Sequence, residues 1–411
     1  MNKKKIVNDP VYGFITIPNE LIYDIIQHPY FQRLRRIKQL GLTEYVYPGA
    51  LHTRFQHALG AMHLMTKALD TLRQKGHLIL DAEYEAAQIA ILLHDIGHGP
   101  FSHTLEFSLF DGVDHEKITG WTLEKLNQDF EGKLSMAIQI FEGSYPRKFL
   151  TQLVSSQLDT DRLDYLNRDR FFTGVQEGTI GAERIIKMLD VKNDELVVEE
   201  KGIYSIESFL SARRIMYWQV YLHKTSISAE NMLIQLISQA KRLRQSGVEV
   251  PATPAFSIFL ERNITAEEFA EDPDLLGVFM LLDDTDIWGS IKFWMNHPDK
   301  VLQLLSKMLL NRNLFQVKLL NEPSEPSTRT LIKDEIMRVY QFSAEEADSF
   351  YSFGTVSNEA YVSTNSSINI LKKDGTLIDV ALAGDLPNIK AISKIVQKHY
   401  LCWPKNVNLH D

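Results

Sequence analysis

His94 and Asp95 are adjacent in the chain and follow an apolar run that ends at Leu93. An imidazole and a carboxylate are both good ligands for a divalent transition metal. Neighbouring side chains on a helix diverge by about 100°, so the pair can bind one ion only if a helix end turns both groups into a common pocket. The other ligands must then come from elsewhere in the chain.

His57 is one candidate, and the aspartates of residues 158–169, Asp161 among them, are candidates for a further carboxylate ligand. His57 belongs to a group of histidines between residues 52 and 115, and Asp161 lies in an acidic stretch at residues 158–169. A lone histidine on a helix is more often a packed or surface residue, but a group of them favours ligands. Two imidazoles and two carboxylates suit Mn, Fe, Zn, Ni, Co or Mg. Such a site polarises a phosphoryl group and generates hydroxide near neutral pH.

Helices are predicted to position these residues. Residues 54–75 space their apolar side chains by three and four, as a buried helical face does, and residues 81–95 are apolar nearly all round, as expected of a central helix. The sequence predicts further helices over residues 20–28, 30–40, 115–129, 132–141, 146–168, 180–189, 206–224 and 229–245.

Strands are expected in fewer places. Alternation around Lys201-Gly202 predicts a small β-hairpin that protrudes from the helical body. Residues 315–320 read as a strand, and residues 368–380 as a hairpin that turns at Asp374-Gly375. We therefore expect a mainly α protein. Its helical catalytic core would span residues 1–250, with the metal site within about 50–170, and a smaller α+β lobe would span residues 251–411.

Composition limits the class of protein. The chain has 411 residues, of which 44% are hydrophobic and 24% charged, and its apolar runs are too short for a membrane span. We expect a cytoplasmic protein. The single cysteine, Cys402, excludes an internal disulfide and a cysteine-based metal site. A net charge of −9 makes nucleic acid an unlikely main partner. Local basic clusters are either solvated helix faces or contacts for a small polyanionic substrate.

Several ordered blocks carry a family resemblance. His57, His94-Asp95 and Asp161 follow the H…HD…D pattern of HD-domain phosphohydrolases. Residues 7–13, 31–41, 53–57, 93–103 and 161–169 resemble the deoxynucleoside triphosphate triphosphohydrolase (dNTPase, dGTPase) branch. The similarity spans about residues 5–245 and is greatest to the catalytic region of the mammalian SAM-and-HD-domain dNTPase and its bacterial relatives.

The resemblance implies roles for individual residues. His57, His94, Asp95 and Asp161 would hold a divalent metal. The reaction would be attack of an activated water on the α-phosphorus of a dNTP, with dGTP one candidate for the preferred substrate, giving deoxynucleoside and triphosphate. The residues that match the family's substrate contacts are Gln39, Leu40, Arg54, Arg162, Tyr165, Asp169, Arg213 and Tyr221. Without the resemblance, the two tyrosines would be read as helix packing.

The resemblance also implies catalytic and regulatory residues. His98, His103 and His115 match the family's catalytic histidines, and we expect His103, or His115 behind it, to protonate the leaving oxygen. Glu106 stands where close relatives have an aspartate. Lys5, Asn8 and Arg35 match parts of a nucleotide activator site between subunits, which implies a homo-oligomer, dimer or tetramer.

Two other functions stay open on the sequence. A different HD hydrolase, acting on cyclic nucleotides, alarmone or nucleoside monophosphates, would share the metal ligands but not the sugar contacts at Gln39, Leu40 and Tyr221. A non-catalytic nucleotide sensor or single-strand nucleic-acid binder would have lost metal ligands, and here the set is intact.

Overall fold

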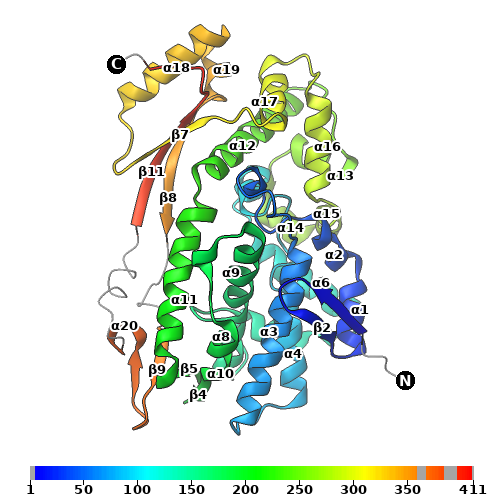
Figure 1. The fold of residues 1–411 in the computed structure, drawn as a ribbon. Coiled ribbons are helices and arrows are strands. Elements are labelled where there is room, and N and C mark those ends of the chain that lie inside the picture. The colour runs from blue at the N-terminus through cyan, green and yellow to red at the C-terminus, as the bar shows by residue number, and fades with distance from the viewer. Residues whose placement is uncertain (1–4, 359–366, 384–395, 410–411) are drawn as a thin grey trace.

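Helices dominate the chain, as expected for a mainly α protein (Figure 1). The computed structural model describes residues 5–358, 367–383 and 396–409. It begins with an antiparallel hairpin of β1 (Lys5–Asp9) and β2 (Gly13–Ile17), which the sequence analysis did not anticipate. Helices α1 (Glu20–Gln27) and α2 (Pro29–Arg33) follow.

Three helices form the centre of the first hydrophobic core. They are α3 (Arg54–Gln74), α4 (Asp81–Leu93) and α9 (Thr160–Thr173), and α3 packs against both of the others. The Gln56 side chain accepts the Thr53 N–H at 2.9 Å, and that of Glu83 accepts the Leu80 N–H at 2.9 Å, so both α3 and α4 begin at capped ends. The predictions of helices beginning at Arg54 and Asp81 are confirmed. Because α4 ends at Leu93, His94 lies at its C-cap.

Two predicted helices are shorter than the sequence indicated. The helix predicted over residues 30–40 ends at Arg33, continues as a 3₁₀ turn to Arg36 and becomes extended at Ile37. Its backbone leaves the helix because the Ile37 carbonyl accepts the Arg54 N–H at 3.0 Å. The single helix predicted over residues 146–168 is also wrong, since α8 (Lys148–Val154) and α9 are separate. The break follows from Asp159, whose carboxylate caps α9 by accepting the backbone N–H of Arg162 at 2.7 Å.

The predicted β-hairpin exists, but its turn was misplaced. It consists of β4 (Leu189–Lys192) and β5 (Glu195–Glu199), and it turns at Asn193-Asp194, where both residues have positive φ angles of 54° and 62°. Such turns favour Asn and Asp. Lys201-Gly202 lies instead in a 3₁₀ turn.

The hairpin does not protrude alone. It forms a four-stranded sheet, because β5 pairs in parallel with β9 (Asn369–Leu371), which forms the expected second hairpin with β10 (Leu377–Asp379). The last helix of this part, α20 (Val380–Ala383), follows β10 directly.

The other helices before residue 250 contribute to one or the other of two hydrophobic cores. They are α5 (His103–Leu109), α6 (His115–Asp129), α7 (Ser135–Glu142), α10 (Ala182–Met188), α11 (Ile203–Met216) and α12 (Lys224–Gln245). The helix predicted over residues 206–224 is interrupted by a π-helical turn, Tyr217–Tyr221, and α12 begins at Lys224 after the cap residue His223. A π-helical turn often marks a functional site.

Helices and strands alternate after residue 250, as expected for an α+β region. The helices are α13 (Pro254–Glu261), α14 (Ala266–Glu271), α15 (Pro273–Phe279), α16 (Asp284–Trp294), α17 (Lys300–Leu310), α18 (Pro326–Tyr340) and α19 (Ala344–Asp348). A three-stranded antiparallel sheet has the order β7 (Gln316–Leu320), β11 (Val396–Trp403), β8 (Ser352–Asn358). The short strands β3 (Phe110–Asp111) and β6 (Ile264–Thr265) pair in parallel.

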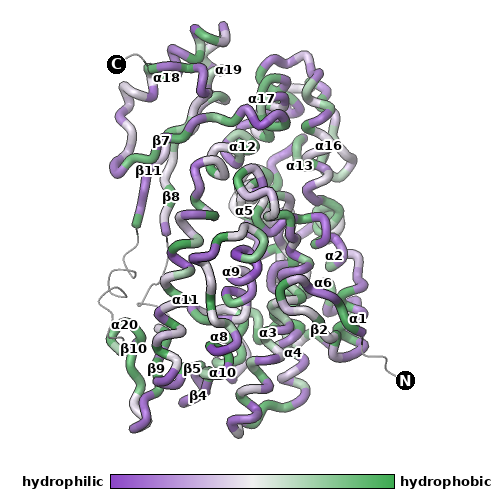
Figure 2. Tube along the Cα trace, viewed as in Figure 1, coloured by the Kyte–Doolittle hydropathy of each residue, from purple (hydrophilic) through white to green (hydrophobic). Residues whose placement is uncertain are grey.

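A second hydrophobic core joins this region to the earlier helices. Leu42, Phe101 and Leu105 belong to the same buried cluster as residues of α12 to α17. In Figure 2, hydrophobic and hydrophilic residues alternate along most helices, and the buried hydrophobic ones make up the two cores. A domain boundary near residue 250 stays a prediction. Among the described residues, none of the helices combines the length and hydropathy that crossing a membrane requires.

Candidate metal centre

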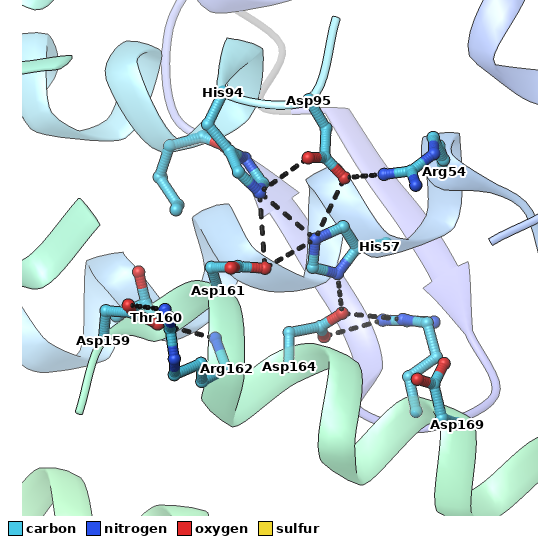
Figure 3. A network of polar contacts seen from close by, with 12 residues as sticks. Arg54, His57, His94, Asp95, Asp159, Thr160, Asp161, Arg162, Asp164 and Asp169 are labelled. Atoms are coloured by element: carbon cyan, nitrogen blue, oxygen red, sulfur yellow. Dashed lines mark hydrogen bonds and ion pairs between the residues drawn. The ribbon is translucent and has the colours of Figure 1, made fainter. Parts of the chain in front are cut away.

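Three helices bring the predicted metal ligands to one point (Figure 3). His57 comes from α3, His94 and Asp95 from the end of α4, and Asp161 from α9. The Nε2 atom of His57 lies 3.3 Å from His94 Nε2 and 3.1 Å from Asp161 Oδ1, and His94 Nε2 lies 3.3 Å from Asp161 Oδ1. These three residues form the convergent group, and Asp95 lies beside it, with Oδ1 3.4 Å from His94 Nε2 and Oδ2, which also pairs with Arg54, 3.6 Å from His57 Nε2.

The hydrogen-bond partner on the outer side of each imidazole determines which ring nitrogen carries the proton and which faces the centre. His57 Nδ1 lies 2.7 Å from Asp164 Oδ2, and His94 Nδ1 lies 2.6 Å from the Ile91 carbonyl oxygen. Both partners accept a proton, so both Nδ1 atoms donate and both Nε2 lone pairs point at the carboxylates and at each other. Two imidazole lone pairs and the carboxylate oxygens, directed at one point, are suitable ligand atoms for a divalent cation.

Electrostatics lead to the same conclusion. Burial alone would lower the pKa of His57, but hydrogen bonds to Asp161 and Asp164 and the charge of Asp95 raise it to about 10. Burial would raise the pKa of Asp161, but His57 and His94 hold it well below its usual range. Positive charge between the carboxylates therefore stabilises this group, and either a protonated His57 or a bound divalent cation would supply it.

A buried ion-pair chain supports His57 from behind. Arg168 donates to Asp164 through Nε (2.9 Å) and Nη2 (3.1 Å), and its Nη1 donates to Asp9 Oδ2 at 2.7 Å. The side chains of Asp164 and Arg168 are both fully buried. Sequence reasoning gave no role to Asp9, Asp164 or Arg168. The one available signal was spacing, since Asp161, Asp164 and Arg168 follow helical intervals of three and four.

Arg54 lies at the edge of the centre. Its guanidinium forms an ion pair with Asp95 and donates from Nε to Ser102 Oγ at 2.9 Å. Phe101 and Ser102 both have positive φ angles, 55° and 54°, which is a strained backbone for residues other than glycine. The loop after α4 thus places a hydroxyl beside the arginine that was predicted to bind phosphate.

Two of the predicted catalytic histidines stack on each other. The rings of His98 and His115 are 3.9 Å apart and 16° from parallel, and His98 Nε2 lies 3.3 Å from Asp95 Oδ1. Gly97 permits this contact, because a Cβ atom there would lie 2.4 Å from the His115 carbonyl oxygen. Burial, followed by the charge of Arg54, holds the pKa of His98 well below its usual value.

The carboxylate of Asp169, on α9, has two hydrogen-bond partners from other parts of the chain. His52 Nε2 lies 2.7 Å from Asp169 Oδ1, and the Tyr221 hydroxyl donates to Asp169 Oδ2 at 2.8 Å. The π-helical turn supplies Tyr221, whose ring meets that of Tyr165 edge-on at 6.2 Å. His52 was not assigned a role from the sequence, although it lies two residues before Arg54.

The other predicted substrate contacts are held by neighbours in the fold. Gln39 donates its backbone N–H to the His52 carbonyl at 3.0 Å, while its buried Oε1 has no hydrogen-bond partner among the described residues. Leu40 is half-buried against the first core. Arg162 pairs with Asp159, and Arg213 donates to Gln157 Oε1 at 2.9 Å.

Comparison with known proteins agrees with this geometry. A family model of the HD domain matches residues 54–167, and one of the HD associated region matches residues 180–248. A solved phosphohydrolase from Bacteroides thetaiotaomicron is 54% identical, covers 98% of this chain and is itself covered completely, with a TM-score of 0.95. This chain belongs to the HD-domain phosphohydrolase family.

Other relatives of this HD-domain phosphohydrolase are more distant. The uncharacterized protein YwfO of Bacillus subtilis is 34% identical, and the match covers 80% of this chain and 75% of that protein. A deoxynucleoside triphosphate triphosphohydrolase SAMHD1 homolog of Dictyostelium discoideum is 30% identical over 66% of this chain. The match covers 56% of that relative, little more than half its length.

Some predicted residues of this HD-domain phosphohydrolase lie apart from the centre or beyond description. Lys5 Nζ lies 3.3 Å above the ring of Tyr23, and Arg35 stacks 3.6 Å from the ring of Phe55. Asn8 is exposed on β1, and no hydrogen bond or ion pair within the described residues joins these three. Their role as an activator site stays a prediction. His103 begins α5, which also contains Glu106, but both side chains lie outside the described part of the chain.

Proposed function

We propose that this HD-domain phosphohydrolase converts a dNTP to deoxynucleoside and triphosphate. The observation that carries the proposal is the order of residues on α9. Asp161, Tyr165 and Asp169 follow at intervals of four and therefore share one face of the helix, over a length of about 12 Å. One end of this face lies in the metal centre and the other carries the carboxylate held by His52 and Tyr221. That length suits the α-phosphate and sugar of one nucleotide.

The ligands of the ion would be His57, His94, Asp95 and Asp161, and Mn, Fe, Zn, Ni, Co or Mg would suit them. When bound, a divalent ion polarises the phosphoryl group and lowers the pKa of a water to near neutrality. Asp164 keeps His57 in the tautomer that presents Nε2. The backbone carbonyl of Ile91 does the same for His94.

Arginines would hold the phosphates. The guanidinium of Arg54 is planar and binds two oxygens at once, and it already lies against Asp95 and Ser102. Burial raises the pKa of the Tyr165 hydroxyl, and the charges of Arg213 and Arg162 oppose that rise, so both arginines lie near the same part of α9. Their positions support contacts with the phosphate oxygens.

A proton must reach the deoxynucleoside 5′-oxygen as the bond to phosphorus breaks, because an alkoxide is a poor leaving group. A histidine is suited to this transfer. We assign the proton to His103, or to His115 behind it. His98 lies between His115 and Asp95 and would orient these two side chains. Glu106, in the same helix as His103, would orient that histidine.

Selectivity for deoxyribose would come from residues outside the metal centre. Gln39 and Leu40 would pack where a 2′-hydroxyl would lie, and the buried Oε1 of Gln39 is a polar atom ready for a ligand. Asp169 would accept the 3′-hydroxyl, beside the rings of Tyr165 and Tyr221. We further propose a homo-oligomer with a nucleotide activator near Lys5, Asn8 and Arg35.

The test is to incubate the protein with each dNTP and NTP, singly and in pairs, with Mn or Mg, and to measure released triphosphate. His57→Ala should abolish release. His63→Ala, six residues further along α3 and outside the centre, should retain it. Activity only on cyclic nucleotides, alarmone or monophosphates, or no hydrolysis of any nucleotide pair, would overturn the proposal.

A further inference from the structure

Asp284, the first residue of α16, joins two loops that are distant in the sequence. Its carboxylate accepts the Lys38 N–H through Oδ2 at 2.9 Å and the Phe101 N–H through Oδ1 at 2.8 Å. The residue is only 4% exposed. One buried side chain from the α+β region therefore fixes backbone on both sides of the candidate site.

Both loops carry residues of the candidate site. Lys38 immediately precedes Gln39 and Leu40, and the Lys38 carbonyl accepts a hydrogen bond from Ser102 Oγ at 3.4 Å. Ser102 follows Phe101 and accepts the Nε–H of Arg54 at 2.9 Å. The chain of contacts from Asp284 thus reaches the arginine on one side and the neighbour of Gln39 on the other.

The backbone at Phe101 and Ser102 needs such a support. Both residues have positive φ angles, which persist only where the surroundings hold them. Besides the carboxylate of Asp284, the ring of Trp288 on α16 meets that of Phe101 edge-on at 5.5 Å. Both contacts come from the same helix.

The start of α16 is itself held firmly. Fully buried Arg33 donates from Nε to the Leu282 carbonyl at 2.6 Å, and Arg36 forms an ion pair with Asp283. Figure 1 shows α15 close to α2, where these contacts are made. The residues just before α16 therefore cannot move away from the loop that leads to Gln39 without breaking this hydrogen bond and this ion pair.

We infer that Asp284 is a positioning residue that sets the discrimination between deoxyribose and ribose. It does so by fixing Gln39 and Leu40 relative to Arg54, so that a 2′-hydroxyl meets packed side chains while the phosphate stays bound. The inference rests on the proposed function. It adds a determinant of specificity that lies outside residues 54–167 and 180–248, which the two family models match.

The test compares kcat/KM for a dNTP and the corresponding NTP in the wild type and in Asp284→Asn. The amide is nearly the same size but has one acceptor oxygen, so one of the two backbone N–H groups loses its partner. We expect the preference for dNTP over NTP to fall about tenfold, the equivalent of one good hydrogen bond. A merely structural role would lower both values by the same factor.

The matched control is Asp286→Asn. Asp286 lies in the same first turn of α16 and accepts the Asp283 N–H at 2.8 Å, but it contacts neither Lys38 nor Phe101. Its substitution should reduce stability without changing the preference. If Asp284→Asn does not fold, Ser102→Ala breaks the same chain of contacts at the other loop and should also reduce the preference.

The outcomes separate the two proposals. A wild type that releases no triphosphate overturns the proposed function. In that case, the ratio of the binding affinities for nonhydrolysable dNTP and NTP analogues, measured at equilibrium in the wild type and the variants, still tests the inference about Asp284. Unchanged preference in Asp284→Asn and in Ser102→Ala, in an otherwise dNTP-selective enzyme, overturns the inference about Asp284 alone.

Discussion

Gly60 on α3 faces the carboxylate of Asp164 on α9. A Cβ atom at Gly60 would lie 2.1 Å from Asp164 Oδ1 and 2.2 Å from Arg168 Nη2. Neither group can withdraw easily, because the two form a fully buried ion pair. The absence of a side chain at Gly60 therefore lets α9 approach α3 closely enough for Asp161 to reach His57.

Gly60→Ala should separate these helices. We expect a loss of about 1–3 kcal/mol in the free energy of unfolding from overpacking, together with weaker metal binding, measured by urea denaturation and by metal content after dialysis. The control is Gly120→Ala on α6, where nothing lies within 4 Å of the added atom. That helical substitution should stabilise slightly. Equal effects of the two variants would contradict the prediction.

Asp164→Asn should weaken metal binding without removing a ligand. The amide no longer holds His57 Nδ1–H as a carboxylate does, and loss of such a partner typically costs about 10–100-fold in metal affinity. Titration calorimetry with Mn measures this. Asp190→Asn removes a comparable carboxylate from His77, at 2.5 Å, on β4. If Asp164→Asn binds Mn as tightly as Asp190→Asn does, then His57 does not need the carboxylate of Asp164 to bind metal.

His115→Ala should separate metal binding from turnover. If His115 or His103 supplies the proton, each alanine variant should lower kcat about 10²–10⁴-fold and retain bound metal. Single-turnover release of triphosphate and metal analysis of the same samples provide the two measurements. Glu116→Gln, at the next position of α6, should behave as the wild type. Full turnover in both histidine variants would refute the assignment.

The stability contribution of Asp284 should depend on pH. Burial raises the pKa of this carboxyl to about 6, and the charge of Asp283 adds to the rise, while hydrogen bonds from Lys38 and Phe101 oppose it. The unfolded chain releases the same proton near pH 4. Because the folded state binds the proton more tightly, the contribution is complete below pH 4 and is lost as pH rises through about 6.

Asp284→Asn removes this titration. The difference in unfolding free energy between wild type and variant should therefore fall by about 2–3 kcal/mol between pH 4 and pH 7, measured by urea denaturation at one-unit intervals. Taking the difference removes the titration of all other groups. A difference that stays constant with pH would mean that Asp284 has the same pKa in the folded and unfolded chains.

Local pattern determined much of the helical core. Apolar spacing identified α3 and α4, and residue type identified His57, His94 and Asp95 as candidate ligands, because few side chains bind a divalent ion. Residue type left several aspartates of residues 158–169 open, and the resemblance selected Asp161 among them. The roles assigned to the surrounding substrate residues came from the resemblance and remain predictions. The boundaries failed where a side chain competes with the helix, as Asp159 does at the start of α9.

Only the tertiary structure decided how the site is supported. Asp9, His52, Asp164 and Arg168 act through contacts between distant segments, and Asp284 reaches Lys38 and Phe101 across more than 180 residues. Such hydrogen bonds have no period in the sequence, since they depend on which backbone groups the packed helices leave without partners. Residue type and spacing thus identified the candidate ligands, whereas packing determined which side chains orient them.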